Sequence, residues 1–184
     1  MNKIIRLCEP YSSEAISDLR MGDMVEITGT IYTARDAAHK RLIEALLAGR
    51  NLPFTLEGSI IYYAGPSPAK PGKAIGSCGP TTSGRMDAYT PALLEAGLIG
   101  MVGKGPRSPE VIEALKKHGA VYFAAVGGAA ALTAQSIVEA EIVAYEDLGP
   151  EAIRRLKVVN YPCMVAIDSS GHNIYEEGPR RFAQ

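Results

Sequence analysis

Apolar and polar positions repeat with two different periods along this chain, and the two periods alternate. Residues 23–32, DMVEITGTIY, alternate apolar with polar side chains, which is the period of a half-buried strand. Apolar residues then recur at helical spacing over residues 42–47, between Asp36 at the expected N-cap and Gly49 at the expected C-terminal stop. The pattern predicts a strand and then a helix, with Arg35 at the junction between them.

The same alternation continues toward the end of the chain. The best-marked helix covers residues 109–118, because Ser108 precedes Pro109 at the first helical position and Gly119 follows the last turn. Further helices are expected over residues 91–96 and 130–140, and further strands over residues 59–64, 73–77, 98–102, 120–126, 141–145 and 164–168. This order predicts an α/β layered fold with some parallel pairing, in which the alternating first strand indicates an antiparallel or exposed part of the sheet.

Size and charge narrow the class of protein. The 184 residues suffice for one domain with a real core, so residues 1–184 are expected to form a single domain. The 19 Lys+Arg and 20 Asp+Glu give a net charge of −1, which argues against a nucleic-acid or membrane-surface partner. The first residues are too weakly apolar for a signal peptide and no run reaches membrane-spanning length, so we expect a cytoplasmic protein.

The cysteines predict neither a disulfide framework nor a metal site. Cys8, Cys78 and Cys163 are an odd number with wide gaps, without the C-x-x-C spacing of a metal knuckle. Cluster-binding cysteine sets usually have at least two members close in sequence. We therefore interpret the three as reduced, intracellular thiols.

Three cationic residues fall at comparable places in the pattern. Arg35, Arg85 and Lys104 each follow a predicted strand and lie near the start of the next helix. Such loops share the carboxyl edge of an α/β sheet, where helix N-termini and planar Arg side chains favour a carboxylate or phosphate. Taken singly, each has the alternative interpretation of a solvated surface charge. Together, beside Gly-rich loops, they predict a site for a small dianion.

Residues 79–85, GPTTSGR, come close to a phosphate-binding P-loop. Two departures count against nucleotide hydrolysis, because Arg85 replaces the usual Lys and Met86 stands where Ser or Thr should hold magnesium. The loop can still bind a carboxylate through its N–H groups and the hydroxyls of Thr81, Thr82 and Ser83.

Four motifs in this order, ITGTIYTARDAAH, CGPTTSGRMDAYTP, GKG and GGAAAL, resemble the C-terminal domain of iron–sulfur hydro-lyases of the class I fumarase and L-tartrate dehydratase family. The resemblance covers residues 22–178. It implies a swivelling three-layer β/β/α domain with a mixed sheet. In that family the domain closes over a four-iron four-sulfur cluster held by three cysteines of another domain or an alpha subunit. The cysteines of this chain would then be bystanders.

The resemblance also implies roles for individual residues. Arg35 and Arg85 match residues that bind the carboxylates of a C4 dicarboxylate, and Lys104 completes the anion site. Thr81 matches the proposed proton-transfer group, although a threonine hydroxyl needs activation by a neighbouring charge or a partner's base. The expected site set is Thr81 and Lys104 as catalytic residues, Arg35, Arg85, Thr82 and Gly79 as substrate-binding residues, and His39 and Asp36 behind them.

The remaining polar and small residues have simpler interpretations. Asp36 and Asp87 are expected to cap helices. His39, one turn into a helix, is either a surface residue or a group that orients the site. Gly127 and Gly128 are expected to pack, with their backbone available to line the substrate loop.

The function implied by the resemblance is reversible hydration of fumarate to malate, by a beta subunit that is active only with its alpha partner. An L-tartrate dehydratase beta subunit is the alternative, since the same arginine pair serves either C4 acid. Homodimerisation of this chain within a heterotetramer is also possible. From another class comes a non-catalytic dicarboxylate-binding module, which would bind ligand tightly by itself.

Overall fold

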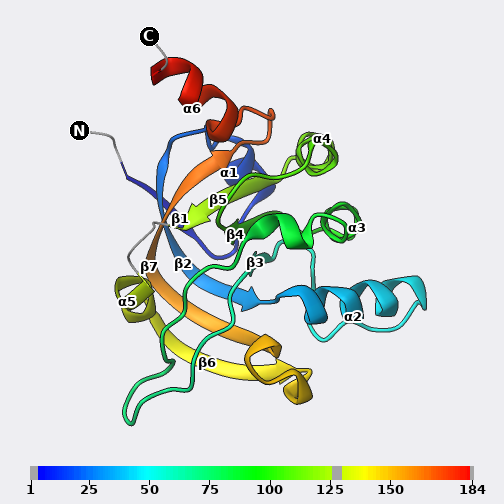
Figure 1. The fold of residues 1–184 in the computed structure, drawn as a ribbon, viewed down its shortest axis with the longest axis vertical. Coiled ribbons are helices and arrows are strands. Elements are labelled where there is room, and N and C mark those ends of the chain that lie inside the picture. The colour runs from blue at the N-terminus through cyan, green and yellow to red at the C-terminus, as the bar shows by residue number, and fades with distance from the viewer. Residues whose placement is uncertain (1–3, 126–129, 183–184) are drawn as a thin grey trace.

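The computed structural model describes residues 4–125 and 130–182, which form one mixed α/β unit (Figure 1). Seven strands of the described residues make a sheet in the order β1-β2-β3-β4-β5-β7-β6. The strands are β1 Ile5–Cys8, β2 Met24–Thr33, β3 Ile60–Tyr62, β4 Gly100–Gly103, β5 Val121–Ala125, β6 Ile137–Ala144 and β7 Ile153–Ile167. Parallel pairing runs from β1 through β5, and β7 is antiparallel to its neighbours. The predicted α/β class and mixed sheet are confirmed.

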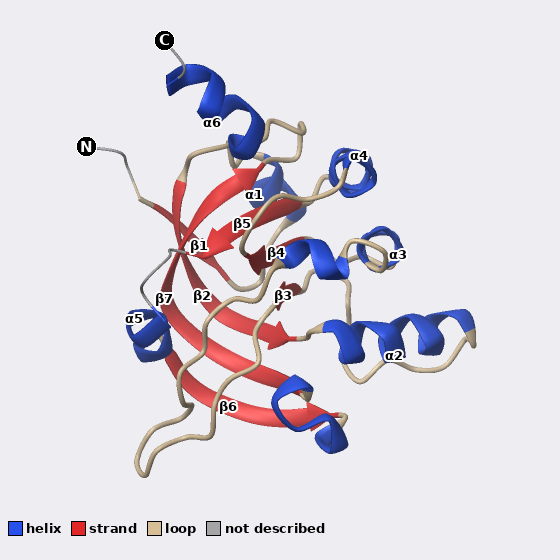
Figure 2. Ribbon diagram, viewed as in Figure 1, coloured by secondary structure: helices blue, strands red, loops and turns tan. Residues whose placement is uncertain are grey.

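The sheet closes on itself, which the sequence does not predict. β2 also pairs with β7, so β2, β3, β4, β5 and β7 form a closed five-stranded ring with β1 and β6 outside it. Figure 2 shows the strands gathered at the centre and the helices around them. A bulge between Ile27 and Gly29 bends β2 within this pairing. The mixed sheet is thus a closed barrel with two outer strands, where the sequence predicts a layered fold.

The helices gather mainly on one flank of the barrel, where α2, α3 and α4 lie in succession (Figure 1). The helical segments are α1 Ser13–Ser17, α2 Asp36–Leu47, η1 Ser83–Met86, α3 Thr90–Glu95, α4 Pro109–His118, α5 Ala130–Gln135, η2 Glu146–Glu151 and α6 Ile174–Phe182, with η marking 3-10 helices. The predicted start and stop of α4 are confirmed, since Ser108 accepts from the Val111 amide and Gly119 is left-handed. None of the described helices combines the length and hydrophobicity of a membrane-spanning segment.

Two apolar cores follow from the alternation of side chains along the strands. Inside the barrel, Ile27, Tyr62 and Phe123 belong to one cluster. On the outer face, Ile61 and Tyr122 join residues of the flanking helices in a second cluster. Strands β3 to β5 are therefore buried on both faces, which explains their continuous apolar runs.

Several sequence predictions are wrong. Residues 73–77 form an irregular loop instead of a strand. The helix expected over residues 130–140 ends at Gln135, and β6 begins at Ile137. β1, α1, α6 and most of β7 were not predicted. β7 contains Pro162 and several charged residues, which interrupt the apolar alternation that would predict a strand.

Candidate anion-binding site

Two of the three cationic residues predicted from the sequence lie at one edge of the parallel strands. The third, Arg85, lies in η1 after a loop, so the prediction that it follows a strand is wrong. Thr33 pairs with Tyr62, and Tyr62 pairs with Val102, so β2, β3 and β4 end at the same level. Arg35 follows β2 and Lys104 follows β4. These strand ends are where ligands bind in open α/β sheets. The structure therefore places both residues where the sequence predicts an anion site.

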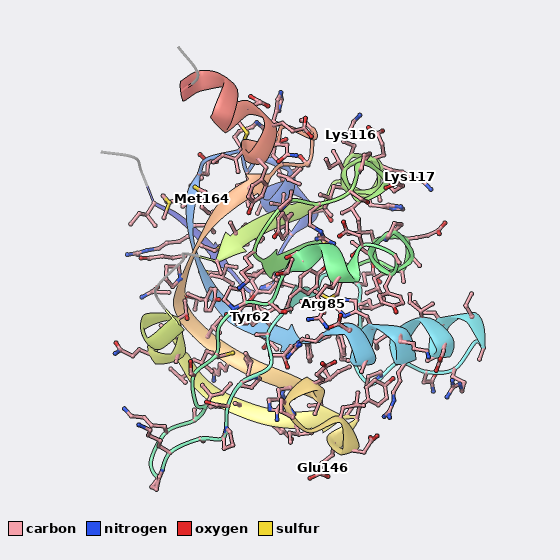
Figure 3. All side chains as sticks on the ribbon, viewed as in Figure 1. Tyr62, Arg85, Lys116, Lys117, Glu146 and Met164 are labelled. Atoms are coloured by element: carbon pink, nitrogen blue, oxygen red, sulfur yellow. The ribbon has the colours of Figure 1, made fainter. Side chains whose placement is uncertain are left out.

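Asp36 lies between the two arginines. Arg85 Nε donates to Asp36 Oδ1 at 2.7 Å, and Arg35 Nη2 is 3.9 Å from Asp36 Oδ2. Figure 3 shows Arg85 close to the start of α2, to which Asp36 belongs. The Arg85 side chain is 53% exposed, and its contact with Asp36 uses Nε. The terminal nitrogens of Arg85 can therefore donate to a ligand carboxylate.

The prediction that Asp36 is an N-cap is wrong. Asp36 is the first helical residue of α2, and Arg35 occupies the cap position without a side-chain cap hydrogen bond. The carboxylate that serves this helix end comes instead from Glu151, whose Oε2 accepts from the Ala37 amide at 3.0 Å. Because Glu151 satisfies that donor, the Asp36 side chain is available to Arg85.

Sequence reasoning missed Glu151. Besides the start of α2, it contacts Arg35, with 3.4 Å between Glu151 Oε1 and Arg35 Nη2. Glu151 is the last residue of η2, and its bond to Ala37 joins positions 114 residues apart. No local pattern in the sequence could have predicted such a contact.

Gly65 gives Arg35 room to lie across the loop after β3. A Cβ at Gly65 would come within 2.9 Å of Arg35 Nη1 and 3.1 Å of the Pro150 carbonyl oxygen. The absence of a side chain thus permits the approach of the guanidinium group. The glycine is visible in the sequence directly after the predicted strand, but its neighbour is not.

The loop of Thr81 and Thr82 is tied to two strand ends. The Thr81 amide donates to the Tyr63 carbonyl at 2.7 Å, and Thr82 forms an isolated parallel bridge with Lys104. Gly79 immediately precedes Pro80, which bridges to Ala64 beyond β3. The predicted loop and the predicted lysine are therefore brought side by side.

Ser83 strengthens the attachment of the loop to Lys104. Its amide donates to the Lys104 carbonyl at 2.9 Å, and its Oγ accepts from the Lys104 amide at 3.0 Å. A Cβ at Gly103 would lie 1.9 Å from Ser83 Oγ, so Gly103 must lack a side chain. The glycine of β4 thus permits the contact that holds the loop beside Lys104.

His39 is fully buried, so its interpretation as a surface residue is wrong. Its Nδ1 lies 2.9 Å from the Arg35 carbonyl oxygen, and its ring meets Tyr63 edge-on at a centroid distance of 5.3 Å. Burial lowers the pKa of His39 to about 4. Near neutral pH the ring is therefore uncharged and donates from Nδ1 to Arg35, which supports the backbone of the site.

Tyr89 occupies the N-cap position of α3, whereas Asp87 is the C-cap residue of η1. Its Oδ2 accepts from the Ser108 amide at 2.6 Å, and its Oδ1 accepts from Arg107 Nε at 2.7 Å. Arg107, which the sequence reasoning also missed, is buried, and an arginine in a polar loop carries no local signal of burial. Gly127 and Gly128, expected to pack or to line the site, lie outside the described residues.

The described residues do not fit an iron–sulfur cluster. Among them, no group of three or more His, Cys, Asp or Glu side chains lies close enough to hold a metal ion. Cys8 is exposed, whereas Cys78 and Cys163 are buried. Burial raises the pKa of Cys78 to about 12, which opposes the thiolate that binds iron. A cluster used by this chain would have to be held by other residues.

One cavity lies away from the cationic edge. It measures about 600 Å³ and lies between the loop of residues 67–77 and residues 134–138. Arg35, Arg85 and Lys104 do not line it. The cationic edge is thus a separate feature of the molecule.

Fold and site together define the class: an α/β barrel domain with a cationic edge. The sequence profile described as Fumarase C-terminus matches residues 1–178. The chain belongs to this family.

Relatives fall into two groups. Fumarate hydratase class I, anaerobic, of Escherichia coli (strain K12) is 41% identical over 164 residues, which are 88% of this chain and 30% of that protein. Fumarate hydratase 1, mitochondrial, of Leishmania major is 40% identical over 155 residues, 83% of this chain and 28% of that protein. The putative L(+)-tartrate dehydratase subunit beta of Methanocaldococcus jannaschii is 43% identical over 168 residues, 88% of this chain and 86% of that protein. The chain thus spans less than a third of the fumarate hydratases and most of the beta subunit.

Proposed function

We propose that this chain is the beta subunit of an iron–sulfur hydro-lyase, which hydrates fumarate reversibly to malate together with an alpha subunit. The observation that carries the proposal is the placement of Arg35 and Arg85 on either side of Asp36, at the edge where Lys104 also lies. Membership of the fumarase family and identity to fumarate hydratases support the reaction class.

A separate subunit is supported by the match to a protein named as a beta subunit over 86% of its length. The cluster is assigned to the alpha partner, because the described residues of this chain do not fit it. In this proposal the domain moves as a unit to bring its cationic edge over the partner. Turnover then needs both chains.

The proposed roles follow from the chemistry of the side chains. Arg35 and Arg85 bind and orient the two carboxylates of the substrate. As the carbon next to a carboxylate loses its proton, that carboxylate gains enolate character, and a guanidinium group held nearby stabilises the extra charge. Lys104 adds a third positive charge. The Thr81 hydroxyl is assigned to the proton transfer, with a base from the partner to activate it.

L-tartrate is the second candidate substrate. It is favoured by the 43% identity to the putative tartrate dehydratase subunit, whose length this chain matches. Both acids have four carbons and two carboxylates, so the same two arginines serve either. The extra hydroxyl of tartrate would need a further polar contact, which the partner could supply.

The test is anaerobic reconstitution of this chain with a cluster-loaded alpha partner, followed by assays with fumarate, malate and tartrate. We expect interconversion of fumarate and malate by the complex and none by this chain alone. Preference for tartrate would select the second candidate. Absence of turnover, combined with tight dicarboxylate binding by this chain alone, would contradict the proposal and favour a non-catalytic binding module.

A further inference from the structure

A buried arginine lies beneath the loop that carries Arg85. The Arg107 side chain has no exposed surface and belongs to the segment between β4 and α4. Its guanidinium carbon lies 5.3 Å from the Tyr63 ring centroid and 4.9 Å from that of Tyr122. These distances allow cation–π attraction on two sides. The proposed chemistry gives this buried charge no role.

Directed hydrogen bonds join Arg107 to the residues that follow Arg85. Nε donates to Asp87 Oδ1 at 2.7 Å, and Nη2 donates to Thr90 Oγ1 at 2.7 Å. The second oxygen of Asp87 accepts from the Ser108 amide at 2.6 Å. Arg107 and Ser108 both precede α4, so Asp87 ties the end of η1 to that segment.

A second buried link lies on the other side of Arg85. The Tyr122 hydroxyl is 2.8 Å from Ser83 Oγ and donates to the Gly105 carbonyl at 2.9 Å. Ser83 in turn holds both backbone groups of Lys104. The backbone is therefore fixed two residues before Arg85 by Ser83 and two residues after it by Asp87.

The hydrogen bonds of Arg107 and Asp87 are more strongly directional than the stability of the fold alone requires. A buried ion pair can often be replaced by apolar residues without loss of stability, because desolvation offsets most of its attraction. Its bonds nevertheless fix the relative position of the segments that it joins. In this chain those segments carry Arg85 and Lys104.

We propose that Arg107, together with Asp87, is a positioning residue that sets the spacing between Arg85 and Lys104. The inference rests on the proposed function, since it assigns both cations to one substrate. Arg107 acts through the loop and does not touch the substrate.

The test compares Arg107→Lys and Asp87→Asn with Val111→Ala. Lysine keeps the charge of Arg107 but lacks the planar guanidinium group that binds Asp87 and Thr90 together. Asparagine keeps the shape of Asp87 without its charge. Val111 is fully buried on α4, and its side chain makes no hydrogen bond, so its truncation weakens the same helix without removing a hydrogen bond to the loop. The three variants are compared at temperatures equally far below their own melting temperatures.

Two readouts separate positioning from general destabilisation. In the reconstituted complex, we expect Arg107→Lys and Asp87→Asn to lower kcat/KM for the dicarboxylate by on the order of tenfold or more, because misplaced binding groups slow reaction steeply. In the free chain, hydrogen exchange of the Ser83 and Lys104 amides should become faster. Val111→Ala should leave kcat/KM and the relative protection of these amides within about twofold of wild type.

Different experimental outcomes contradict the positioning role and the proposed function. A wild-type complex that turns over, with Arg107→Lys and Asp87→Asn indistinguishable from Val111→Ala in both readouts, would overturn the positioning role alone. A wild-type complex without turnover would overturn the function. Hydrogen exchange would still report whether Arg107 fixes the loop, and unchanged Ser83 and Lys104 exchange would overturn the positioning role independently.

Discussion

The charge balance at the cationic edge depends on five side chains. Arg35, Arg85 and Lys104 are positive, and Asp36 and Glu151 are negative, so three charges against two leave an excess of one positive charge. The arginines are thus held by carboxylates of the chain itself, with nitrogens left to donate. This positive excess attracts an anionic ligand.

A pH prediction follows from the buried ring of His39. Its pKa of about 4 in the folded chain lies below the ordinary value of 6.5, so between these values the unfolded state binds a proton that the folded state does not. Stability must therefore fall as the pH drops from 6.5 toward 4, by no more than roughly 3 kcal/mol from this group. We expect His39→Gln, measured by urea unfolding across this range, to lose less stability on acidification than wild type. Equal losses in the two proteins would show that His39 does not titrate as a buried group.

At the scale of elements, the sequence predicts β2, β3 and β4 and the helices α2, α3 and α4, because their apolar periods are local. It misses β1 and α1, and it predicts a strand over residues 73–77 that is a loop. It fails at β7, where Pro162 and charged residues break the pattern. It also fails at the start of α2, because Asp36 has the right residue type for a cap while a remote carboxylate occupies that role. The three cationic residues and Asp36 could be singled out from the sequence, whereas Glu151, which contacts Arg35, could not.

Glu151 should stabilise α2 from outside the helix. Its carboxylate accepts from the Ala37 amide and lies beside Arg35, so Glu151→Gln removes a charge-assisted bond at the positive end of a helix dipole. We expect a loss of about 1 kcal/mol in the free energy of unfolding. Glu146→Gln, an exposed change in the same 3-10 segment, should cost less than about 0.5 kcal/mol. Equal costs would mean that Glu151 does not cap α2.

At the scale of the whole molecule, closure of the barrel gives the site a rigid support. The β2–β7 pairing joins strands more than a hundred residues apart in sequence, and no local pattern specifies it. The helices α2, α3 and α4 lie on one flank of the barrel (Figure 1), and Asp36 at the start of α2 binds Arg85. A rigid support of this kind suits the proposed movement of the domain as one unit against its partner.

Gly29 tests the packing of residues 9–11 on β2. It has a positive φ of 143° beside the bulge of β2, and a Cβ there would lie 2.5 Å from Glu9 Cβ and 2.6 Å from the Tyr11 hydroxyl oxygen. We expect Gly29→Ala to cost about 2 to 4 kcal/mol in thermal or denaturant unfolding. Gly22→Ala is the matched control, because Gly22 also has positive φ, 90°, but nothing within 4 Å of its Cβ position, so only about 1 kcal/mol of backbone strain is expected. A cost at Gly29 no larger than at Gly22 would contradict the close packing of residues 9–11 on β2.

The central claim is that Arg85 binds a substrate carboxylate, and the most direct test is the activity of Arg85→Ala in the complex reconstituted with the alpha partner. The control is Arg50→Ala, an exposed arginine beyond the end of α2. We predict that Arg85→Ala lowers kcat/KM on the order of 10²-fold, about 3 kcal/mol for a lost bond between charged groups, while Arg50→Ala stays within about twofold of wild type. Equal activity of Arg85→Ala and Arg50→Ala, in complexes with the same cluster content, would contradict the account.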